Sequence, residues 1–266
     1  MNLIKKINCE ANEWAFLRQF TSARIALGKT GVSIPLQECL RLKQAHAQAK
    51  DAVYSAVDKK LLLQTLTNKQ IPVQLVHSKA ANRDIYLQRP DLGRSLSELS
   101  VEVLSQYAAS ADIVIVIADG LSAVAVNKQA APVTMLIIKE AKQAGFSVAP
   151  VVIAEQGRVA IADEIGELLK AKLSIILIGE RPGLTSSESM GAYITYQPKT
   201  GTTDERRNCI SNIKDEGLTP TVAAVKIMQM VKAAFAMQLT GVVLKESSNA
   251  DTVKGIEQEE LLHIIY

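Results

Sequence analysis

Two unbroken runs of β-branched and aliphatic residues constrain the fold most strongly. They are "DIVIVIAD" (residues 112–119) and "LSIILIG" (173–179), and neither alternates apolar with polar positions. Strands of this kind are buried on both faces, which is typical of parallel sheets covered by helices. Weaker apolar runs predict further strands at 72–76, 146–154, 192–196 and 241–245. Pro150 indicates an irregularity or a sheet edge in one of them.

Helix-forming segments separate these strands, at about residues 96–109, 131–144, 158–171 and 220–238. The alternation predicts an α/β fold with a mostly parallel sheet and helices on both faces. Residues 1–67 instead favour helix, with one stretch ending near Gly28 and a second beginning at Pro35. We therefore expect a helical N-terminal region over residues 1–70, followed by an α/β domain over residues 71–266.

Composition excludes several classes of protein. The net charge is only +3, aromatic residues make up 4% of the chain, and no long basic run occurs. These values argue against a nucleic-acid-binding surface. No apolar stretch approaches the roughly 18 residues of a membrane span. The three cysteines are widely spaced and odd in number, which fits a reducing compartment. With no secretory signal visible at the N-terminus, we expect a cytoplasmic protein.

Polar residues follow the two strongest strands directly. "IGERPGL" (178–184) places Glu180 and Arg181 at the end of one, and Asp119-Gly120 end the other. Ligands of open α/β sheets bind at the carboxyl ends of strands. If the two strands are parallel neighbours, these residues share one edge of the sheet. Asp119-Gly120 are also consistent with a plain tight turn.

Familiar catalytic and nucleotide-binding motifs are missing. The sequence contains no G-x-G-x-x-G, no complete P-loop and no G-x-S-x-G. His46, His77 and His263 lack the spacing of metal ligands, and no residue stands out as a metal ligand. The absence of a catalytic constellation fits a binding subunit whose partner performs the chemistry.

Six segments, in order, resemble one family closely. They are "TSARIALGKTG" (21–31), "RDIYLQRPDLGR" (83–94), "DIVIVIADGLSAVAV" (112–126), "GRVAIADEIGELL" (157–169), "IGERPGLTSSES" (178–189) and "RNCISNI" (207–213). Together they are similar to the small subunit (light chain) of ethanolamine ammonia-lyases.

The resemblance implies a function. Enzymes of this family use adenosylcobalamin (coenzyme B12) to convert ethanolamine to acetaldehyde and ammonia, a step of ethanolamine catabolism. The large subunit, a TIM barrel, holds the substrate and most catalytic groups. The small subunit has a Rossmann-like domain and helps to enclose the cobalamin at the interface between the subunits. The resemblance thus implies a carbon–nitrogen lyase acting as a hetero-oligomer, in which this chain contributes no catalytic residue.

Family cobalamin contacts map to three residues of this chain: Val159, Glu180 and Cys209. Glu180 offers acceptors to the corrin side-chain amides, Val159 a backbone N–H, and Cys209 a small, soft group. Without the resemblance, Glu180 is interpreted as half of a surface ion pair, Cys209 as a small buried residue and Val159 as helix packing. The arginine-rich segment at 83–94 is interpreted equally as a solvated loop or as a partner contact.

Other details leave alternatives open. The segment D-x-H-x-x-G is missing, so we expect cobalt to keep its own dimethylbenzimidazole ligand. The sequence before residue 21 is short compared with enteric members, which favours the cytoplasm over a bacterial microcompartment. The tail after residue 245 has no assigned role. The alternative functions are a stand-alone Rossmann-like nucleotide-binding protein and a structural subunit that never touches cofactor.

Overall fold

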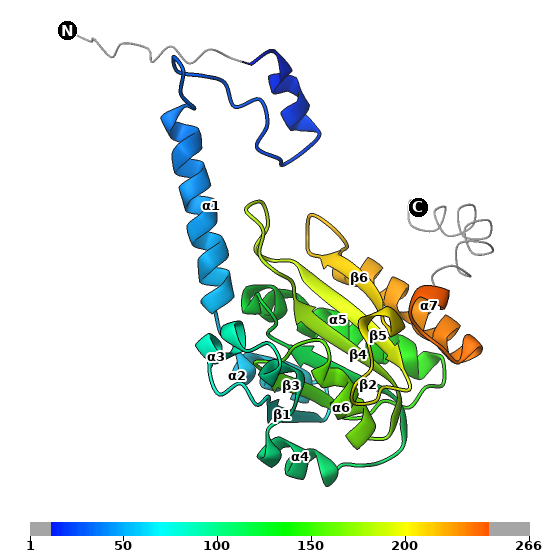
Figure 1. Cartoon of the computed structure of the whole chain (residues 1–266). Helices are drawn as coiled ribbons and strands as arrows, with labels where there is room; N and C mark the ends of the chain where they lie inside the picture. Colours follow the sequence, from blue (N-terminus) through cyan, green and yellow to red (C-terminus); the bar gives the residue numbers. More distant parts are fainter. Residues whose placement is uncertain (1–11, 245–266) are drawn as a thin grey trace, which may run out of the picture.

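A single six-stranded sheet organises the chain. The computed structural model describes residues 12–244, and the strand order is β1-β3-β2-β4-β5-β6 (Figure 1). The first four strands in this order are parallel to one another, β5 pairs antiparallel with β4, and β6 pairs antiparallel with β5. The strands are β1 (Val73–His77), β2 (Ala111–Ala118), β3 (Val151–Glu155), β4 (Ala171–Gly179), β5 (Met190–Tyr196) and β6 (Asn208–Ile213). The predicted mostly parallel α/β sheet is confirmed.

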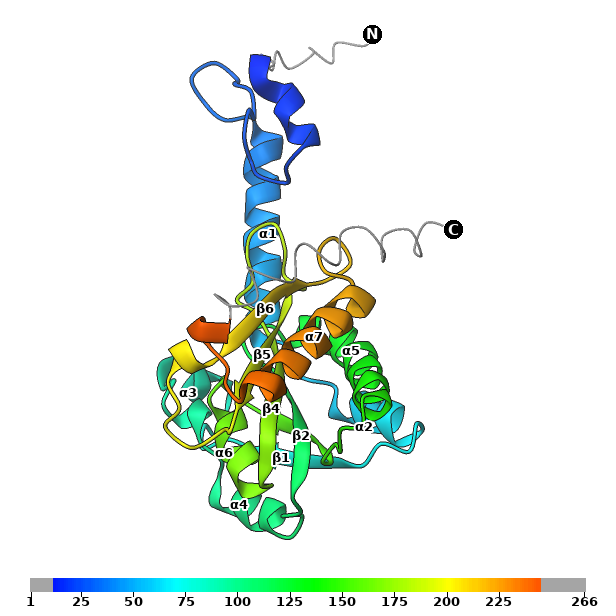
Figure 2. The ribbon, with the colours of Figure 1, turned by 90° about the vertical axis from the view of Figure 1, so that its right-hand side faces the viewer.

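Helices cover both faces of the sheet, as Figure 2 shows. One face packs against α2 (Lys59–Thr67), α5 (Ala123–Gln143) and α7 (Pro220–Met237). The other packs against α4 (Glu98–Ser105) and α6 (Ile161–Leu168). Shorter helical turns are α3 (Arg83–Gln88), η2 (Leu92–Arg94) and η3 (Asp204–Arg206). This double coverage explains why β2 and β4 are apolar at nearly every position.

Coverage of the antiparallel strands is one-sided. Helix α7 packs against β5 and β6, whereas α6 lies against β4 on the opposite face. On the α6 side, Tyr193 is only half-buried and its register partner Cys209 is exposed. A β-bulge follows in β6, where Ser211 and Asn212 are both exposed. We call this surface, marked by Tyr193 and Cys209, the open face.

The N-terminal residues form an arm that projects from the sheet. It consists of η1 (Glu13–Gln19), a connecting loop and α1 (Leu36–Tyr54), and we call residues 13–54 the N-terminal arm (Figures 1 and 2). Many of its apolar side chains are exposed in the isolated chain. They include Trp14, Phe16, Phe20, Val32, Ile34, Leu36 and Leu40.

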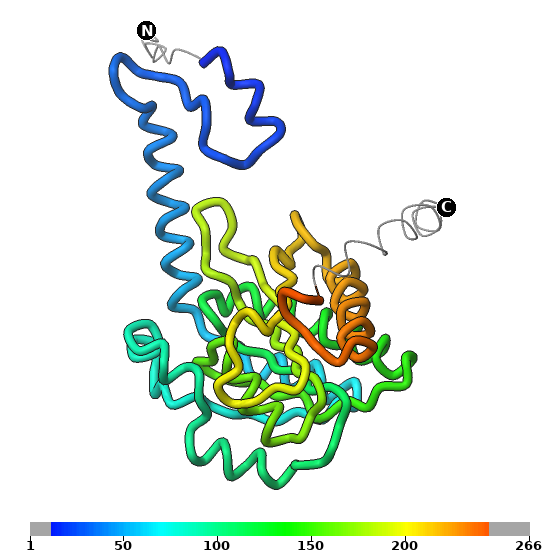
Figure 3. Tube along the Cα trace, turned by 45° about the vertical axis from the view of Figure 1, so that its right-hand side comes forward, coloured from blue at the N-terminus to red at the C-terminus, as the bar shows by residue number. Residues whose placement is uncertain are grey.

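The β4–β5 loop rises beside α1 towards this arm, as the tube in Figure 3 makes clear. The guanidinium of Arg24 donates a hydrogen bond to the carbonyl of Leu184 at 2.8 Å and so joins the two. The arm and the carboxyl end of β4 therefore lie on the same side of the molecule.

Three expectations about secondary structure were wrong. Residues 20–28 are not helical, and Ala26 and Gly28 there have positive φ angles. The expected single helix after Pro35 is two, because residues 55–58 break it and Asp58 caps α2. Residues 242–244 are helical rather than part of a strand, and Lys245 lies outside the described residues.

The sheet also contains a strand that the sequence pattern did not predict. It is β6, "NCISNI", which has only two large apolar residues, Ile210 and Ile213, and both enter the core under α7. Cys209, Ser211 and Asn212 are exposed, and Asn208 is buried through hydrogen bonds to the backbone of Gly241, so apolar runs could not reveal the strand. Pro150 precedes β3, which is paired on both sides; the residue marks an irregular entry to an interior strand and not an edge.

A partly exposed carboxylate connects three segments at the start of β2. Asp112 accepts a hydrogen bond from the Lys172 ammonium of β4 at 2.9 Å, and from the backbone N–H of Ser147 at 2.9 Å. The bond from Lys172, followed by those from Ser147, lowers the pKa of Asp112 to about 2. The folded state therefore favours the ionised carboxylate.

We expect Asp112→Asn to lower the free energy of unfolding at pH 7 by about 1–2 kcal/mol. An unfolded Asp has a pKa of about 3.9, so the stabilisation is complete above that pH. It is lost as the pH falls through the folded value of about 2. Urea unfolding between pH 7 and pH 2 should show the difference between wild type and variant shrinking with acid. Asp51→Asn, on the exposed side of α1, is the control and should change stability little at any pH. If Asp112→Asn lowered the free energy of unfolding equally at every pH, the lowered pKa of Asp112 would be contradicted.

Candidate functional site at the carboxyl edge of the sheet

The two strongest strands end side by side. Strand β2 pairs with β4 in parallel, so Asp119 and Glu180 lie at one edge of the sheet, as the sequence predicted. The backbones touch there: the N–H of Leu121 donates to the carbonyl of Gly179 at 2.9 Å. A Cβ on Gly179 would lie 2.1 Å from the carbonyl of Ser122, and one on Gly120 would lie 2.3 Å from the carbonyl of Gly179. Only glycine fits at this crossing.

Asp119 has a structural task. Its buried carboxylate accepts the backbone N–H groups of Gly120, Gln156 and Gly157 at 3.0–3.1 Å. Arg83 lies 3.6 Å away. Burial raises the pKa of Asp119, while the charge of Arg83 and the three backbone donors oppose that rise. The carboxylate thus closes the crevice between the ends of β2 and β3, which favours the tight-turn interpretation over a ligand site.

The arginine-rich segment 83–94 is built into the fold through Tyr86. The guanidinium groups of Arg83 and Arg158 lie 4.6 Å and 4.1 Å from the centre of its ring. The hydroxyl donates to the carbonyl of Gly157 at 3.2 Å. Burial raises the pKa of Tyr86 to about 12, against the opposing charge of Arg158. This segment therefore holds the β3–α6 loop in place and is more than a solvated loop.

Glu180 follows β4 and bridges three strands. Its Oε2 accepts the hydroxyl of Ser189 at 2.5 Å and the backbone N–H of Asn212 in β6 at 3.4 Å. Its backbone N–H donates to the carbonyl of Ser189 at 2.9 Å. The second oxygen, Oε1, accepts no hydrogen bond from residues 12–244. The side chain is half-buried, and no ion pair with Arg181 forms within those residues.

Cys209 lies beside Tyr193 on the open face, directly across the β5–β6 pair. Desolvation raises the pKa of the Cys209 thiol; the Tyr193 hydroxyl opposes this shift and the Glu180 carboxylate adds to it. Burial, together with Cys209 and Glu180, raises the pKa of Tyr193 to about 12. Both groups are therefore neutral near pH 7. Cys209 is exposed, which excludes its interpretation as a buried core residue.

Val159 lies in the turn between β3 and α6. The helix begins at Ile161, its N-cap is Ala160, and no side chain caps it. The backbone N–H of Val159 finds no acceptor within the described part of the chain, while its carbonyl accepts from Ala162. The side chain packs, half-buried, against the same part of the core as Tyr193. A free donor thus adjoins the helix start, as expected, although the helix begins two residues later.

A buried ion pair anchors β6 below the open face. Arg207 donates to Asp163 of α6 at 2.6 Å and to the carbonyl of Thr202 at 2.5 Å. Burial raises the pKa of Asp163 against the influence of Arg207. Sequence reasoning missed Arg207, Ser189 and Tyr193. Arg207 and Cys209 are two positions apart and so face the same side of an extended chain. The sequence would have indicated this only if β6 had been predicted as a strand.

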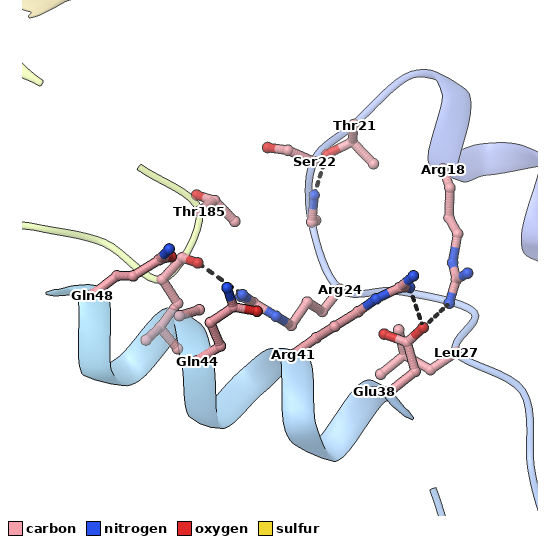
Figure 4. A pocket seen from close by; sticks show the side chains of 13 residues that line it. Arg18, Thr21, Ser22, Arg24, Leu27, Glu38, Arg41, Gln44, Gln48 and Thr185 are labelled. Atoms are coloured by element: carbon pink, nitrogen blue, oxygen red, sulfur yellow. Dashed lines mark hydrogen bonds and ion pairs between the residues drawn. The ribbon is translucent and has the colours of Figure 1, made fainter. Parts of the chain in front are cut away.

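A cavity of about 460 Å³ lies where the N-terminal arm meets the β4–β5 loop (Figure 4). Its arginines are already engaged. Arg18 donates to the carbonyl of Ile25, Arg41 pairs with Glu38 at 2.8 Å, and Arg24 bonds to Leu184. The cavity therefore lies along the contact that holds the arm against the β4–β5 loop.

Residues 12–244 contain neither a metal-ligand cluster nor a helix that could span a membrane. No cluster of three or more His, Cys, Asp or Glu side chains there has the arrangement of a metal site. None of the helices in that range is long and apolar enough to cross a bilayer. His46 is exposed on α1, and Nδ1 of His77 lies 2.7 Å from the carbonyl of Ser78. His263, Cys9 and the C-terminal tail lie outside the described residues.

Comparison with known proteins gives one consistent result. The family model for the ethanolamine ammonia-lyase light chain matches residues 11–245. The ethanolamine ammonia-lyase small subunit of Pseudomonas syringae pv. tomato is 47% identical, covering 98% of this chain and 92% of that protein. The small subunit of Pseudomonas aeruginosa UCBPP-PA14 is 49% identical over 92% of this chain and 91% of its own. This chain belongs to the ethanolamine ammonia-lyase small-subunit family.

Membership confirms the resemblance drawn from the six segments. It makes the chain a component of a carbon–nitrogen lyase and implies a large-subunit partner in a hetero-oligomer. All six segments lie inside the matched range of the small-subunit family model. Val159, Glu180 and Cys209 therefore lie in the part of the chain that matches the small-subunit family.

The environment of Cys209 predicts a slow, alkaline reaction with thiol reagents. In a Cys9→Ser, Cys39→Ser background, the rate of alkylation by iodoacetamide should rise with a midpoint above the ordinary value of 9.0. Adding Glu180→Gln should lower the midpoint, because a neighbouring negative charge is removed. Adding Tyr193→Phe should raise the midpoint, because the hydroxyl that stabilises the Cys209 thiolate is removed.

The pH dependence of the alkylation rate on the full chain checks these shifts. The same background variant unfolded in urea provides the reference thiol. A folded midpoint at or below the unfolded one would show that the described environment of Cys209 is wrong.

Proposed function

We propose that this small subunit helps to enclose adenosylcobalamin at its interface with a TIM-barrel large subunit, for the conversion of ethanolamine to acetaldehyde and ammonia. The observation that carries the proposal is the open face beside Glu180, together with a free backbone donor in the turn before α6. Among residues 12–244, no group donates a hydrogen bond to Oε1 of Glu180, and no group accepts one from the backbone N–H of Val159. A corrin carries amide side chains around an apolar ring, and such a ligand needs both kinds of group.

The chemistry of the open face fits a large neutral ring. Tyr193 and Cys209 are uncharged near pH 7, so covering them leaves no unpaired charge buried. The corrin amide N–H groups would meet Glu180, and an amide carbonyl would meet the N–H of Val159. When bound, adenosylcobalamin supplies the radical chemistry of the reaction. The residues of this chain bind and orient it and exclude water from one side.

A nucleotide-binding role has less support. Open α/β sheets bind nucleotides at the switch point where neighbouring strands lead to helices on opposite faces. Here β2 leads to α5 and β3 to α6, on opposite faces. The backbone N–H groups that would receive a phosphate there, those of Gln156 and Gly157, already donate to Asp119. We therefore do not propose a stand-alone nucleotide-binding function.

We expect ammonia release from ethanolamine to require this chain, its large-subunit partner and adenosylcobalamin together. In the same assay, Glu180→Ala should raise the cofactor concentration for half-maximal rate about tenfold, the effect of losing one hydrogen bond to a charged group. Val159→Leu keeps the backbone N–H and should change this value less.

Intact assembly of each variant, checked by size-exclusion chromatography, separates cofactor contact from loss of the complex. Activity of the partner alone at the full rate would refute a required role for this chain. An unchanged cofactor requirement in Glu180→Ala would support a purely structural subunit instead.

The N-terminal arm is the surface that we assign to the large subunit. It lies on the same side of the molecule as the carboxyl end of β4, so one partner can cover the arm and the open face together (Figure 1). Its exposed aromatic and aliphatic side chains have the composition of an interface core. A monomer rarely leaves so many large apolar side chains of one short segment in water.

Phe20→Glu combined with Val32→Glu should therefore reduce recovery of the large subunit in co-purification at least tenfold, since each charge would be desolvated in the interface. Leu99→Glu is the matched control. Leu99 is 74% exposed on α4, away from the arm, and its variant should assemble normally. Equal recovery for the double variant and the control would exclude the arm from the interface.

A further inference from the structure

Strand β5 separates the two side chains assigned to the cofactor. Glu180 follows β4 on one side of it, and Cys209 lies in β6 on the other. Three residues at alternate positions face these groups: Ser189, which immediately precedes β5, and Gly191 and Tyr193 within it.

Ser189 fixes one oxygen of Glu180. Its hydroxyl donates to Oε2 at 2.5 Å, the short distance of a hydrogen bond to a charged acceptor. Its backbone carbonyl accepts the N–H of Glu180 at 2.9 Å, so the residue holds both ends of the glutamate. With Oε2 occupied by Ser189 and by the N–H of Asn212, only Oε1 is left for an external donor.

Gly191 provides the space in which Oε1 lies. A Cβ at this position would be 3.0 Å from Oε1 and 3.4 Å from Cγ of Glu180. The carboxylate therefore lies across the backbone of β5, where any larger residue would push it. The backbone of Gly191 is not in the positive-φ region, so its absence of a side chain serves this contact and not a turn.

We propose that Ser189 and Gly191 are positioning residues that hold Glu180 with Oε1 directed to an amide N–H of the corrin edge. This inference rests on the proposed function. It goes further by stating which carboxylate oxygen meets the ligand and which residues select it. Ordering a freely rotating carboxylate on binding would cost conformational entropy. A carboxylate that is already fixed avoids this cost.

A double-mutant cycle on cyanocobalamin binding tests the proposal. Cyanocobalamin retains the corrin amides and cannot support the reaction, so binding is measured without activity. Equilibrium dialysis of the two-subunit complex would give its dissociation constant for wild type, Ser189→Ala, Glu180→Ala and the double variant. We expect Ser189→Ala to weaken binding about five- to tenfold, the loss of one hydrogen bond to a charged acceptor. In the Glu180→Ala background it should have almost no further effect.

Matched variants separate positioning from general damage. Ser189→Thr keeps the hydroxyl and should restore most of the affinity. Ser187 lies in the same loop, and in the described structure its side chain makes no hydrogen bond to Glu180. The Ser187→Ala complex should therefore bind cyanocobalamin as tightly as wild type. Gly191→Ala should weaken binding as Ser189→Ala does, by displacing Oε1, and it keeps the test available if Ser189→Ala assembles poorly.

Two results would overturn the inference, and they differ from each other. If Glu180→Ala weakens binding while Ser189→Ala and Gly191→Ala do not, Glu180 contacts the ligand without being positioned by β5. If Ser189→Ala weakens binding equally with and without Glu180, its role is a general structural one. Unchanged binding in Glu180→Ala itself would instead refute the cofactor contact of the proposed function.

Discussion

The contact between the end of β4 and the β2–α5 turn determines the geometry of the carboxyl edge. Gly179 and Gly120 bring two backbones into contact, and the hydrogen bond from Leu121 to the carbonyl of Gly179 fixes their register. The residue after that contact is Glu180. Since the contact admits no side chain, β4 leaves the core at a defined point and angle. The position of Glu180 over β5 follows from backbone packing before any ligand is considered.

The same edge shows how one fold can separate a structural carboxylate from one available to a ligand. Asp119 and Glu180 end neighbouring strands, yet Asp119 has three backbone donors and Arg83 around it. Glu180 has one oxygen satisfied and one free within the described residues. The switch-point crevice, where an open α/β sheet usually binds a ligand, is filled by the protein itself. The open face lies two strands away from β2, on the antiparallel extension.

That extension is exposed because the helical cover ends before it. Helix α6 packs mainly against β4, and its buried Asp163 binds Arg207, the residue immediately before β6. Strands β5 and β6 then extend the sheet beyond the helix on that face. A subunit that buries the open face and the N-terminal arm together would complete both surfaces. Family membership, which implies a large-subunit partner, provides a reason for such incomplete surfaces.

The sequence alone determined the parallel core. The runs at 112–119 and 173–179 have no polar face, so they had to be buried between two helical layers, and they are. The sequence also placed Asp119 and Glu180 at strand ends. It could not distinguish their tasks, because that depends on donors from Gln156, Gly157 and Ser189, which are far away or uninformative in the sequence.

Only the tertiary structure decided the open face. Strand β6 carries too few apolar residues to be recognised, and its placement depends on the buried pair of Arg207 and Asp163, 44 positions apart in the chain. The pairing of Tyr193 with Cys209 follows from that placement. Periodicity reports which side of an element is buried. It does not report which elements leave a face uncovered, because that depends on how far a helix from elsewhere in the chain extends across the sheet.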